Sequence, residues 1–100
     1  MTREQAINLL RENLETIKGF GVRRIGLFGS VVRNEISENS DIDIVVEFEK
    51  GRGGIEEFAD LCDYLENLFG REIDILTPYG IESIRIPYIK REIKNELIYV

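Results

Sequence analysis

Residues 41–48 have the sequence Asp-Ile-Asp-Ile-Val-Val-Glu-Phe, in which apolar side chains recur at every second position from Ile42 onward. A period of two is typical of a β-strand with one face packed on a core. We therefore predict a strand over residues 41–48, with Ile42 and Ile44 among the side chains on its buried face. Asp41 and Asp43 then share the opposite face, with their Cα atoms about 7 Å apart.

Two further strands and a long helix are predicted around this segment. The apolar stretch over residues 22–28 predicts a strand that ends at Gly29, and residues 72–77 alternate in the same way until Pro78, with Asp74 on the face opposite its isoleucines. Apolar residues recur at spacings of three and four over residues 55–69, which predicts an amphipathic helix that Gly70 ends. Cys62 falls on the apolar stripe of this helix and is expected in the core.

The remaining segments also contain helical signals. Thr2 and Gln5 have the spacing of a capping box, and the apolar stripe that follows predicts one helix over residues 3–18. Ser30 is a good N-cap residue, so a short helix over residues 30–36 is expected. A last helix is expected to begin near Pro87, and residues 97–100 to form a short edge strand. Helices interleaved with strands predict an α/β or α+β fold of two layers, a mixed sheet packed against helices.

The composition is that of a small soluble globular protein. The chain has 100 residues, of which 43% are hydrophobic, and we predict a single domain over residues 1–100. It carries 19 acidic residues, 13 basic residues and no histidine, a net charge of -6. The acidic balance argues against direct nucleic-acid binding, which relies on clustered lysine and arginine. The absence of histidine excludes catalysis by a histidine base.

The sequence also limits where the protein is expected to work. No apolar run approaches the roughly 20 residues that span a membrane, and the charged start does not resemble a secretory signal. The one cysteine has no partner for an internal disulfide, and there is no histidine–cysteine cluster for structural zinc. We therefore expect a cytoplasmic protein in a reducing environment, with no membrane partner.

The chemistry is expected where Gly29-Ser30 precedes Asp41 and Asp43. A turn from strand to helix offers free backbone N–H groups to phosphate, glycine permits close approach, and the serine hydroxyl adds a donor. Two carboxylates on a rigid strand suit an oxygen-loving cation such as Mg²⁺. Asp74 would supply a third carboxylate if its strand lies beside the strand over residues 41–48.

Each of these signals also has a simpler interpretation. A pair of aspartates two residues apart is usually the solvated face of an edge strand, and Gly29-Ser30 alone is usually a capped turn. Arg33 is equally compatible with a phosphate contact and with a surface ion pair. The combination of the turn, the pair and the downstream Asp74 is what favours a site.

This combination resembles the signature of the nucleotidyltransferase superfamily related to DNA polymerase β. The matching residues are Gly29-Ser30, the segment 40–46 around Asp41 and Asp43, and Asp74 within residues 72–76. The chain length and residues 96–100 further resemble the minimal branch, the MNT-domain antitoxins encoded beside HEPN ribonuclease toxins. The resemblance covers nearly the whole chain.

The resemblance implies a role for each matching residue. Gly29 and Ser30 would hold the triphosphate of the incoming nucleotide, and Arg33 would contact phosphate or acceptor. Asp41 and Asp43 would be ligands of two Mg²⁺ ions, while Asp74 would bind one of them and assist deprotonation of the attacking hydroxyl. The sequence departs from many relatives at two positions, where Val32 replaces an alanine and Asn34 replaces a glycine.

The resemblance also implies an activity, an antitoxin that transfers AMP from ATP to a tyrosine of a partner HEPN toxin and so neutralises it. An assembly with this toxin is expected. Two alternatives remain open. One is a nucleotidyltransferase acting on a small molecule, similar to the aminoglycoside-modifying enzymes, and the other is an antitoxin without catalysis that masks a surface of its toxin.

Overall fold

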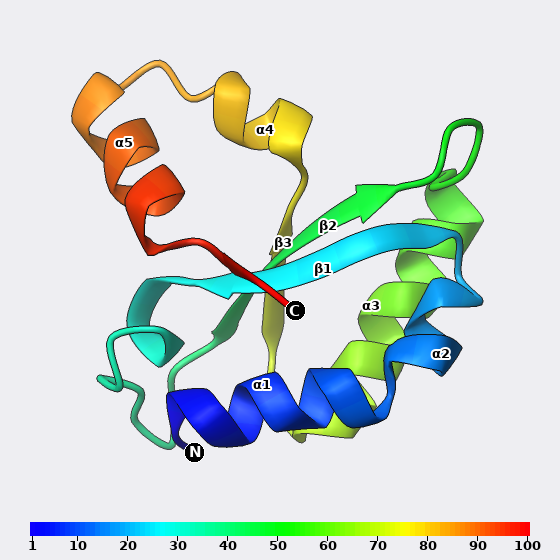
Figure 1. Ribbon diagram of the computed structural model, residues 1–100, viewed down its shortest axis with the longest axis horizontal. Coiled ribbons are helices and arrows are strands. Elements are labelled where there is room, and N and C mark those ends of the chain that lie inside the picture. Colours follow the sequence, from blue (N-terminus) through cyan, green and yellow to red (C-terminus); the bar gives the residue numbers. More distant parts are fainter.

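The computed structural model describes all of residues 1–100 and contains a four-stranded sheet in the order β3-β2-β1-β4 (Figure 1). The strands are β1 (Val22–Phe28), β2 (Ile42–Phe48), β3 (Ile73–Leu76) and β4 (Ile98–Tyr99). β1 is antiparallel to β2 and to β4, whereas β2 and β3 are parallel. This mixed sheet with flanking helices confirms the predicted fold class, and β4 confirms the predicted edge strand.

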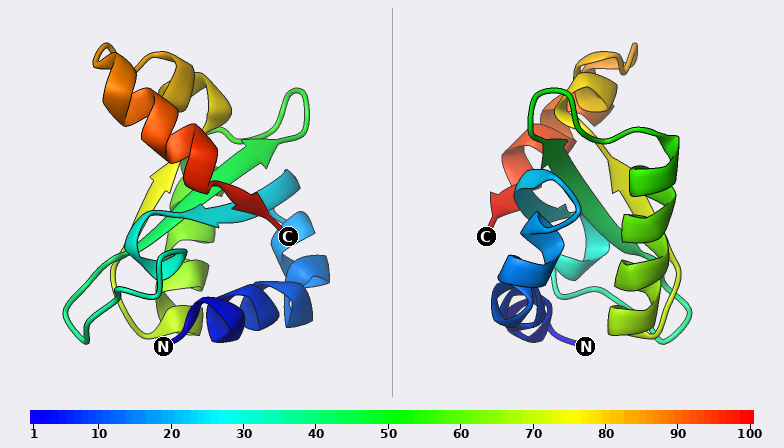
Figure 2. Two further views of the ribbon diagram at one scale, coloured as in Figure 1. Left: turned by 60° about the vertical axis from the view of Figure 1, so that its left-hand side comes forward. Right: turned by 90° about the vertical axis from the view of Figure 1, so that its right-hand side faces the viewer.

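The main core lies between one face of the sheet and the helices α1 (Arg3–Glu12), α2 (Leu14–Lys18) and α3 (Ile55–Phe69) (Figure 2). It contains 15 buried residues. Ile42 and Ile44 of β2 are completely buried in it, so the alternating pattern is confirmed, although the strand begins at Ile42 rather than at Asp41 as predicted. Burial of an aliphatic side chain of this size contributes about 1.5–3 kcal/mol, which holds β2 in one register.

A smaller core lies on the opposite face of the sheet, beneath α4 (Pro78–Glu82) and α5 (Pro87–Glu96). Its buried residues are Phe28, Val45 and Ile81. Val45 is completely buried, whereas Asp43, two residues earlier on the same face of β2, is only half-buried. Figure 1 shows α4 and α5 together beyond one end of the sheet, away from α1 and α3. The predicted aspartates lie on this less covered face.

The prediction of one helix over residues 3–18 is wrong in one respect, because the helix is interrupted at Asn13. The capping box of Thr2 and Gln5 forms as expected, but Asn13 has φ -112° and ψ 14° and separates α1 from α2. Its side-chain amide donates to the carbonyl of Leu9, 2.9 Å away. Asparagine side chains compete in this way with the backbone hydrogen bonds of a helix.

Three other local predictions are corrected by the structure. The expected helix over residues 30–36 is only a short 3-10 turn, η1 (Gly29–Val31), and Ser30 is not its N-cap. Pro78 ends β3 but also begins α4, which the sequence analysis missed, with Thr77 as N-cap. Cys62 is half-buried rather than in the core, and its thiol donates to Glu66. None of the helices combines the length and apolarity needed to cross a membrane.

Candidate functional site

Asp43 and Asp74 are placed by their strands on the sheet face opposite the main core, and Asp41 lies directly before β2. Ile42 and Ile44 point into that core, so the alternation of the strand turns Asp43 the other way. β3 is parallel to β2, and Asp74 is the register partner of Asp43. Because paired strands lie about 4.8 Å apart, these two carboxylates are direct neighbours, with Asp41 one pleat away.

Gly29 approaches Asp43 from the other neighbouring strand. Phe28 is the register partner of Asp43 across the β1–β2 ladder, so the turn that follows Phe28 lies beside the aspartate. Gly29 has φ +74°, and a Cβ atom there would be 3.0 Å from Cγ of Asp43 and closer still to its Oδ2. Only glycine fits this position. The structure therefore brings the glycine turn and the aspartates, which the sequence separates by 11 residues or more, to one place.

The carboxylate of Asp43 has an unusual acidity. Burial raises its pKa from 3.8 to about 6, and the negative charges of Asp74 and Asp41 act in the same direction. A hydrogen bond with Asp74 raises this pKa further, while the charge of Arg33 opposes the shift. A half-buried carboxylate beside others of like charge is typical of functional sites, where a cation relieves the repulsion.

The donor set of this face fits Mg²⁺, which prefers carboxylate oxygens. No group of three or more Asp, Glu, His or Cys side chains is arranged in the structure to hold a metal ion. Asp43 and Asp74 are the two carboxylates that the register of the sheet places side by side. Asp41, directly before β2, adds its negative charge to the surroundings of Asp43.

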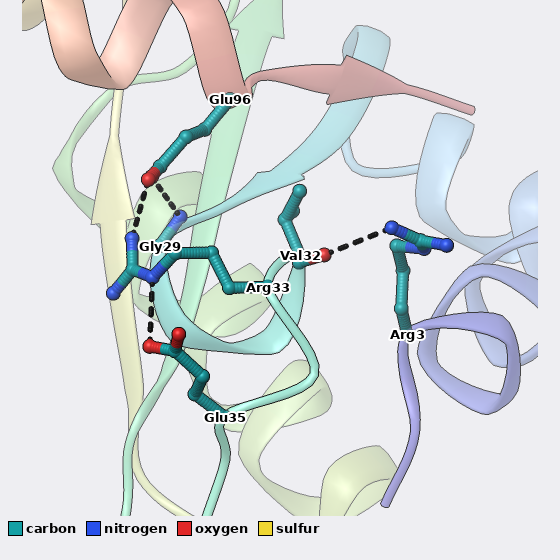
Figure 3. A network of polar contacts seen from close by, with 6 residues as sticks. All are labelled: Arg3, Gly29, Val32, Arg33, Glu35 and Glu96. Atoms are coloured by element: carbon teal, nitrogen blue, oxygen red, sulfur yellow. Dashed lines mark hydrogen bonds and ion pairs between the residues drawn. The ribbon is translucent and has the colours of Figure 1, made fainter.

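Arg33 lies beside the glycine turn but is engaged by two glutamates (Figure 3). Its Nε donates to Glu35 at 3.0 Å and its Nη1 donates to Glu96. Both contacts raise the pKa of the guanidinium, so Arg33 remains a cation. The structure thus places Arg33 in an ion-pair network, one of the two interpretations that the sequence left open, within reach of the charge of Asp43.

Glu96 is the residue of this network that the sequence analysis missed. It is the last residue of α5, and its Oε2 accepts a hydrogen bond from the backbone N–H of Gly29 at 3.2 Å. Its side chain is only 17% exposed. Glu96 and Gly29 are 67 residues apart in sequence, so no local pattern could have indicated their contact.

The two departures from the resemblance have local explanations. Val32 is buried in the main core, where its larger side chain replaces the expected alanine. Asn34 has φ 58°, a left-handed conformation that glycine adopts freely and that asparagine tolerates better than other residues. The side chain of Asn34 also accepts a hydrogen bond from the backbone N–H of Arg3, which fastens the turn to α1.

The hollows of the surface lie away from the aspartates. The largest, of about 690 Å³, lies between Gly19-Phe20 and residues of the 51–60 segment, at the other end of β1 and β2 from Gly29 and Asp43. None of the five hollows is lined by Asp41, Asp43 or Asp74. The candidate site is an open face rather than an enclosed pocket.

Comparisons with known proteins agree with this picture. Residues 7–100 match the nucleotidyltransferase domain family. Protein adenylyltransferase MntA of Thermococcus cleftensis is 36% identical over 101 residues, which cover 100% of this chain and 97% of that protein. A Methanocaldococcus jannaschii protein, likewise named as a protein adenylyltransferase, is 39% identical over 101 residues, covering 99% of this chain and 98% of that protein.

Solved structures share the same fold. A minimal nucleotidyltransferase has a TM-score of 0.74 at 32% identity, over 98% of this chain and 95% of that chain. A toxin–antitoxin crystal structure with AMP-PNP has a TM-score of 0.60 at 22% identity, over 99% of this chain and 72% of that chain. Because the family match spans almost the whole sequence and the fold agrees with it, this chain belongs to the nucleotidyltransferase domain family.

Proposed function

We propose that this protein is an antitoxin that transfers AMP from ATP to a tyrosine of a partner HEPN ribonuclease toxin, in a reaction that requires Mg²⁺. The observation that carries the proposal is the arrangement of Asp43, with Asp74 in register on one side and Gly29 against it on the other. The relatives named as protein adenylyltransferases support a protein as acceptor.

The glycine turn is proposed to hold the triphosphate. The backbone N–H of Gly29 and the hydroxyl of Ser30 are hydrogen-bond donors at the edge of the carboxylate face, and the glycine lets this turn lie against Asp43. Arg33 is a permanent cation beside the turn and would contact phosphate or acceptor.

The carboxylates are proposed to hold two Mg²⁺ ions, with Asp41 and Asp43 as ligands of both and Asp74 as ligand of one. Bound Mg²⁺ would neutralise charge on the triphosphate and lower the pKa of the attacking hydroxyl. In the reaction, the tyrosine oxygen forms a bond to the α-phosphorus, the bond from that phosphorus to the bridging oxygen breaks, and pyrophosphate leaves. Asp74 assists removal of the tyrosine proton. No histidine is needed.

The open character of the site favours a protein acceptor over a small molecule. A small acceptor needs an enclosing pocket for orientation, and none of the surface hollows includes the aspartates. A partner protein brings its own surface and can present a tyrosine to an open face. The net charge of -6 also disfavours a nucleic-acid acceptor.

Transfer of labelled AMP tests the proposal. The purified protein is incubated with ATP labelled at the α-phosphate, Mg²⁺ and the protein encoded beside it, and mass spectrometry locates the added AMP. We expect label on a tyrosine of the partner and loss of the partner's ribonuclease activity. Asp43→Asn and Asp74→Asn should each reduce labelling by about 100-fold or more, because each removes a metal ligand.

Asp63→Asn is the matched control for these variants, because Asp63 is exposed on α3 in the main-core layer. It makes the same chemical change away from the site and should label the partner normally. The proposal is wrong if the unaltered protein transfers no label. It is also wrong if Asp43→Asn still neutralises the toxin fully, which would indicate an antitoxin that acts by binding alone.

A further inference from the structure

Glu96 reaches from the end of α5 into the glycine turn, as Figure 3 shows. One carboxylate oxygen accepts the backbone N–H of Gly29 at 3.2 Å, and the other accepts Nη1 of Arg33. The side chain is 17% exposed, so this carboxylate is largely withdrawn from water and depends on these two donors.

These two donors are the same ones that the proposed function assigns to the nucleotide. A backbone N–H carries one hydrogen, so the N–H of Gly29 serves either the carboxylate of Glu96 or a phosphate oxygen, not both at full strength. The guanidinium of Arg33 gives one N–H of Nη1 to Glu96 and its Nε–H to Glu35, so Glu96 competes with a phosphate for the Nη1 side of this group. Carboxylate and phosphate oxygens are alike as charged acceptors.

We propose that Glu96 is an internal anion that occupies the phosphate subsite of the free enzyme, and that nucleotide binding displaces it. Glu96 thereby sets the affinity for nucleotide. This inference rests on the proposed function, since it takes Gly29 and Arg33 as phosphate ligands.

The negative charges around the turn also disfavour binding of the nucleotide to the free protein. Asp41, Asp43 and Asp74 already make the face negative, and Glu96 adds a further carboxylate at the point where a triphosphate would arrive. Removing the charge of Glu96 therefore lessens the repulsion of the nucleotide, and the glutamine amide, with one acceptor oxygen in place of two, holds the two donors more weakly.

The element that carries Glu96 is suited to such a displacement. α5 has no fully buried residue, and in its last turn only Ile93 packs against the smaller core, so a shift of that turn disturbs few packed side chains. The chain continues directly from Glu96 through Leu97 into β4, which pairs with Gly26 and Leu27 of β1. Nucleotide occupancy is thus coupled to the position of the C-terminal helix.

A purely structural role for Glu96 predicts the opposite result. If its carboxylate served only to hold the glycine turn in place, its removal would loosen the turn and weaken nucleotide binding. The sign of the change in affinity therefore separates the two roles.

Calorimetric titration with AMP-PNP and Mg²⁺ measures this sign. Glu96→Gln keeps the shape of the side chain but removes its charge, and we expect its Kd for AMP-PNP to fall about tenfold, the worth of one charge-assisted hydrogen bond. Glu92→Gln is the matched control, because Glu92 is an exposed glutamate on the same helix. Its Kd should stay within about twofold of the unaltered protein.

A second variant, Glu96→Asp, tests the same prediction independently in case Glu96→Gln does not fold. Glu96→Asp keeps the charge but is one methylene too short to reach both donors, so it should also bind AMP-PNP more tightly. The inference is overturned, with the proposed function intact, if the unaltered protein binds AMP-PNP but the folded Glu96 variants bind equally or more weakly. If neither the unaltered protein nor the variants bind AMP-PNP with Mg²⁺, the proposed function fails and the inference falls with it.

Discussion

At the scale of single residues, the site depends on how closely Gly29 approaches Asp43. Two glycines of the chain make this dependence measurable, because both have a left-handed backbone but different surroundings. Gly29 has φ +74° and a carboxylate against the position of a Cβ atom, whereas Gly51 has φ +80° and no atom within 4 Å of that position. The conformational strain of an alanine is common to both, and the clash occurs only at Gly29.

We expect Gly29→Ala to lower the free energy of unfolding by about 2–4 kcal/mol and Gly51→Ala by about 1 kcal/mol. Gly29→Ala should also reduce AMP transfer at least about tenfold, because Asp43 must move to admit the methyl group. Urea unfolding and the labelling assay measure the two effects. Equal losses of stability in both variants would show that only backbone strain matters at Gly29.

The residues of the site differ in how far the sequence could predict them. The orientation of Asp43 follows from the alternation of its own strand, which is a local property. The pairing of Asp43 with Asp74 needed the order of the strands, so it was conditional in the sequence analysis. The contact of Glu96 with Gly29 depends on where α5 ends in space, and no pattern within either segment contains that information.

At the scale of elements, α3 and α5 are held to the molecule very differently. Both have amphipathic sequences, but α3 buries Leu61, Leu65 and Phe69 in the main core, whereas α5 has no buried residue. The end of α5 is fastened instead by polar contacts of Glu96, and its middle by ion pairs of Lys90 and Lys94 with Glu82. Exposed ion pairs add little stability.

Native-state hydrogen exchange should therefore show α5 opening before the molecule unfolds. We expect amides of α5 to exchange at least about tenfold faster than those of α3, through local opening that leaves the main core intact. Mass spectrometry of peptides from residues 55–69 and 87–96 measures the difference. Equal protection of the two helices would mean that α5 unfolds only together with the core. The displacement of Glu96 could then not rely on a shift of α5.

Two of the elements that the sequence analysis misjudged, the first helix and α4, share one cause. Apolar periodicity correctly predicted α3 and the strands, because burial against the sheet enforces it. The interruption at Asn13 and the short helix α4 depend on single side chains that bond to nearby backbone, Asn13 to Leu9 and Thr77 to Gly80. The dipeptide Thr77-Pro78 does carry an N-cap followed by proline, a signal for a helix start that was interpreted only as a strand end.

At the scale of the whole molecule, we infer that the carboxylates needed for the proposed function lower the stability of the folded protein. The main core on one side of the sheet contains only apolar buried residues, while the other side gathers carboxylates whose mutual repulsion the free protein must sustain. For Asp43, the folded protein raises the pKa to about 6 from 3.8, so the folded state holds this proton more tightly than the unfolded chain. The contribution of Asp43 to the free energy of unfolding must therefore fall as pH rises through this interval.

The free energy of unfolding of the metal-free protein, compared with that of Asp43→Asn, tests whether the charge of Asp43 lowers stability. A shift of about two pH units corresponds to about 3 kcal/mol, and solvent screening of a half-buried group reduces it to about 1–2 kcal/mol. We expect the free energy of unfolding of Asp43→Asn, relative to the unaltered protein, to increase by that amount between about pH 4 and pH 7. The comparison cancels Glu57 and Glu82, whose lowered pKa values act in the opposite sense in both proteins.

Addition of Mg²⁺ at pH 7.5 should then raise the stability of the unaltered protein and leave Asp43→Asn nearly unchanged, because only the former has the repulsion for a cation to relieve. Urea unfolding of both proteins at pH 4 and pH 7 without Mg²⁺, and at pH 7.5 with and without Mg²⁺, supplies the values needed. A pH-independent difference between the two proteins would show that Asp43 is not destabilised by its neighbours. A Mg²⁺ response that is equal in both proteins would place cation binding elsewhere on the acidic surface.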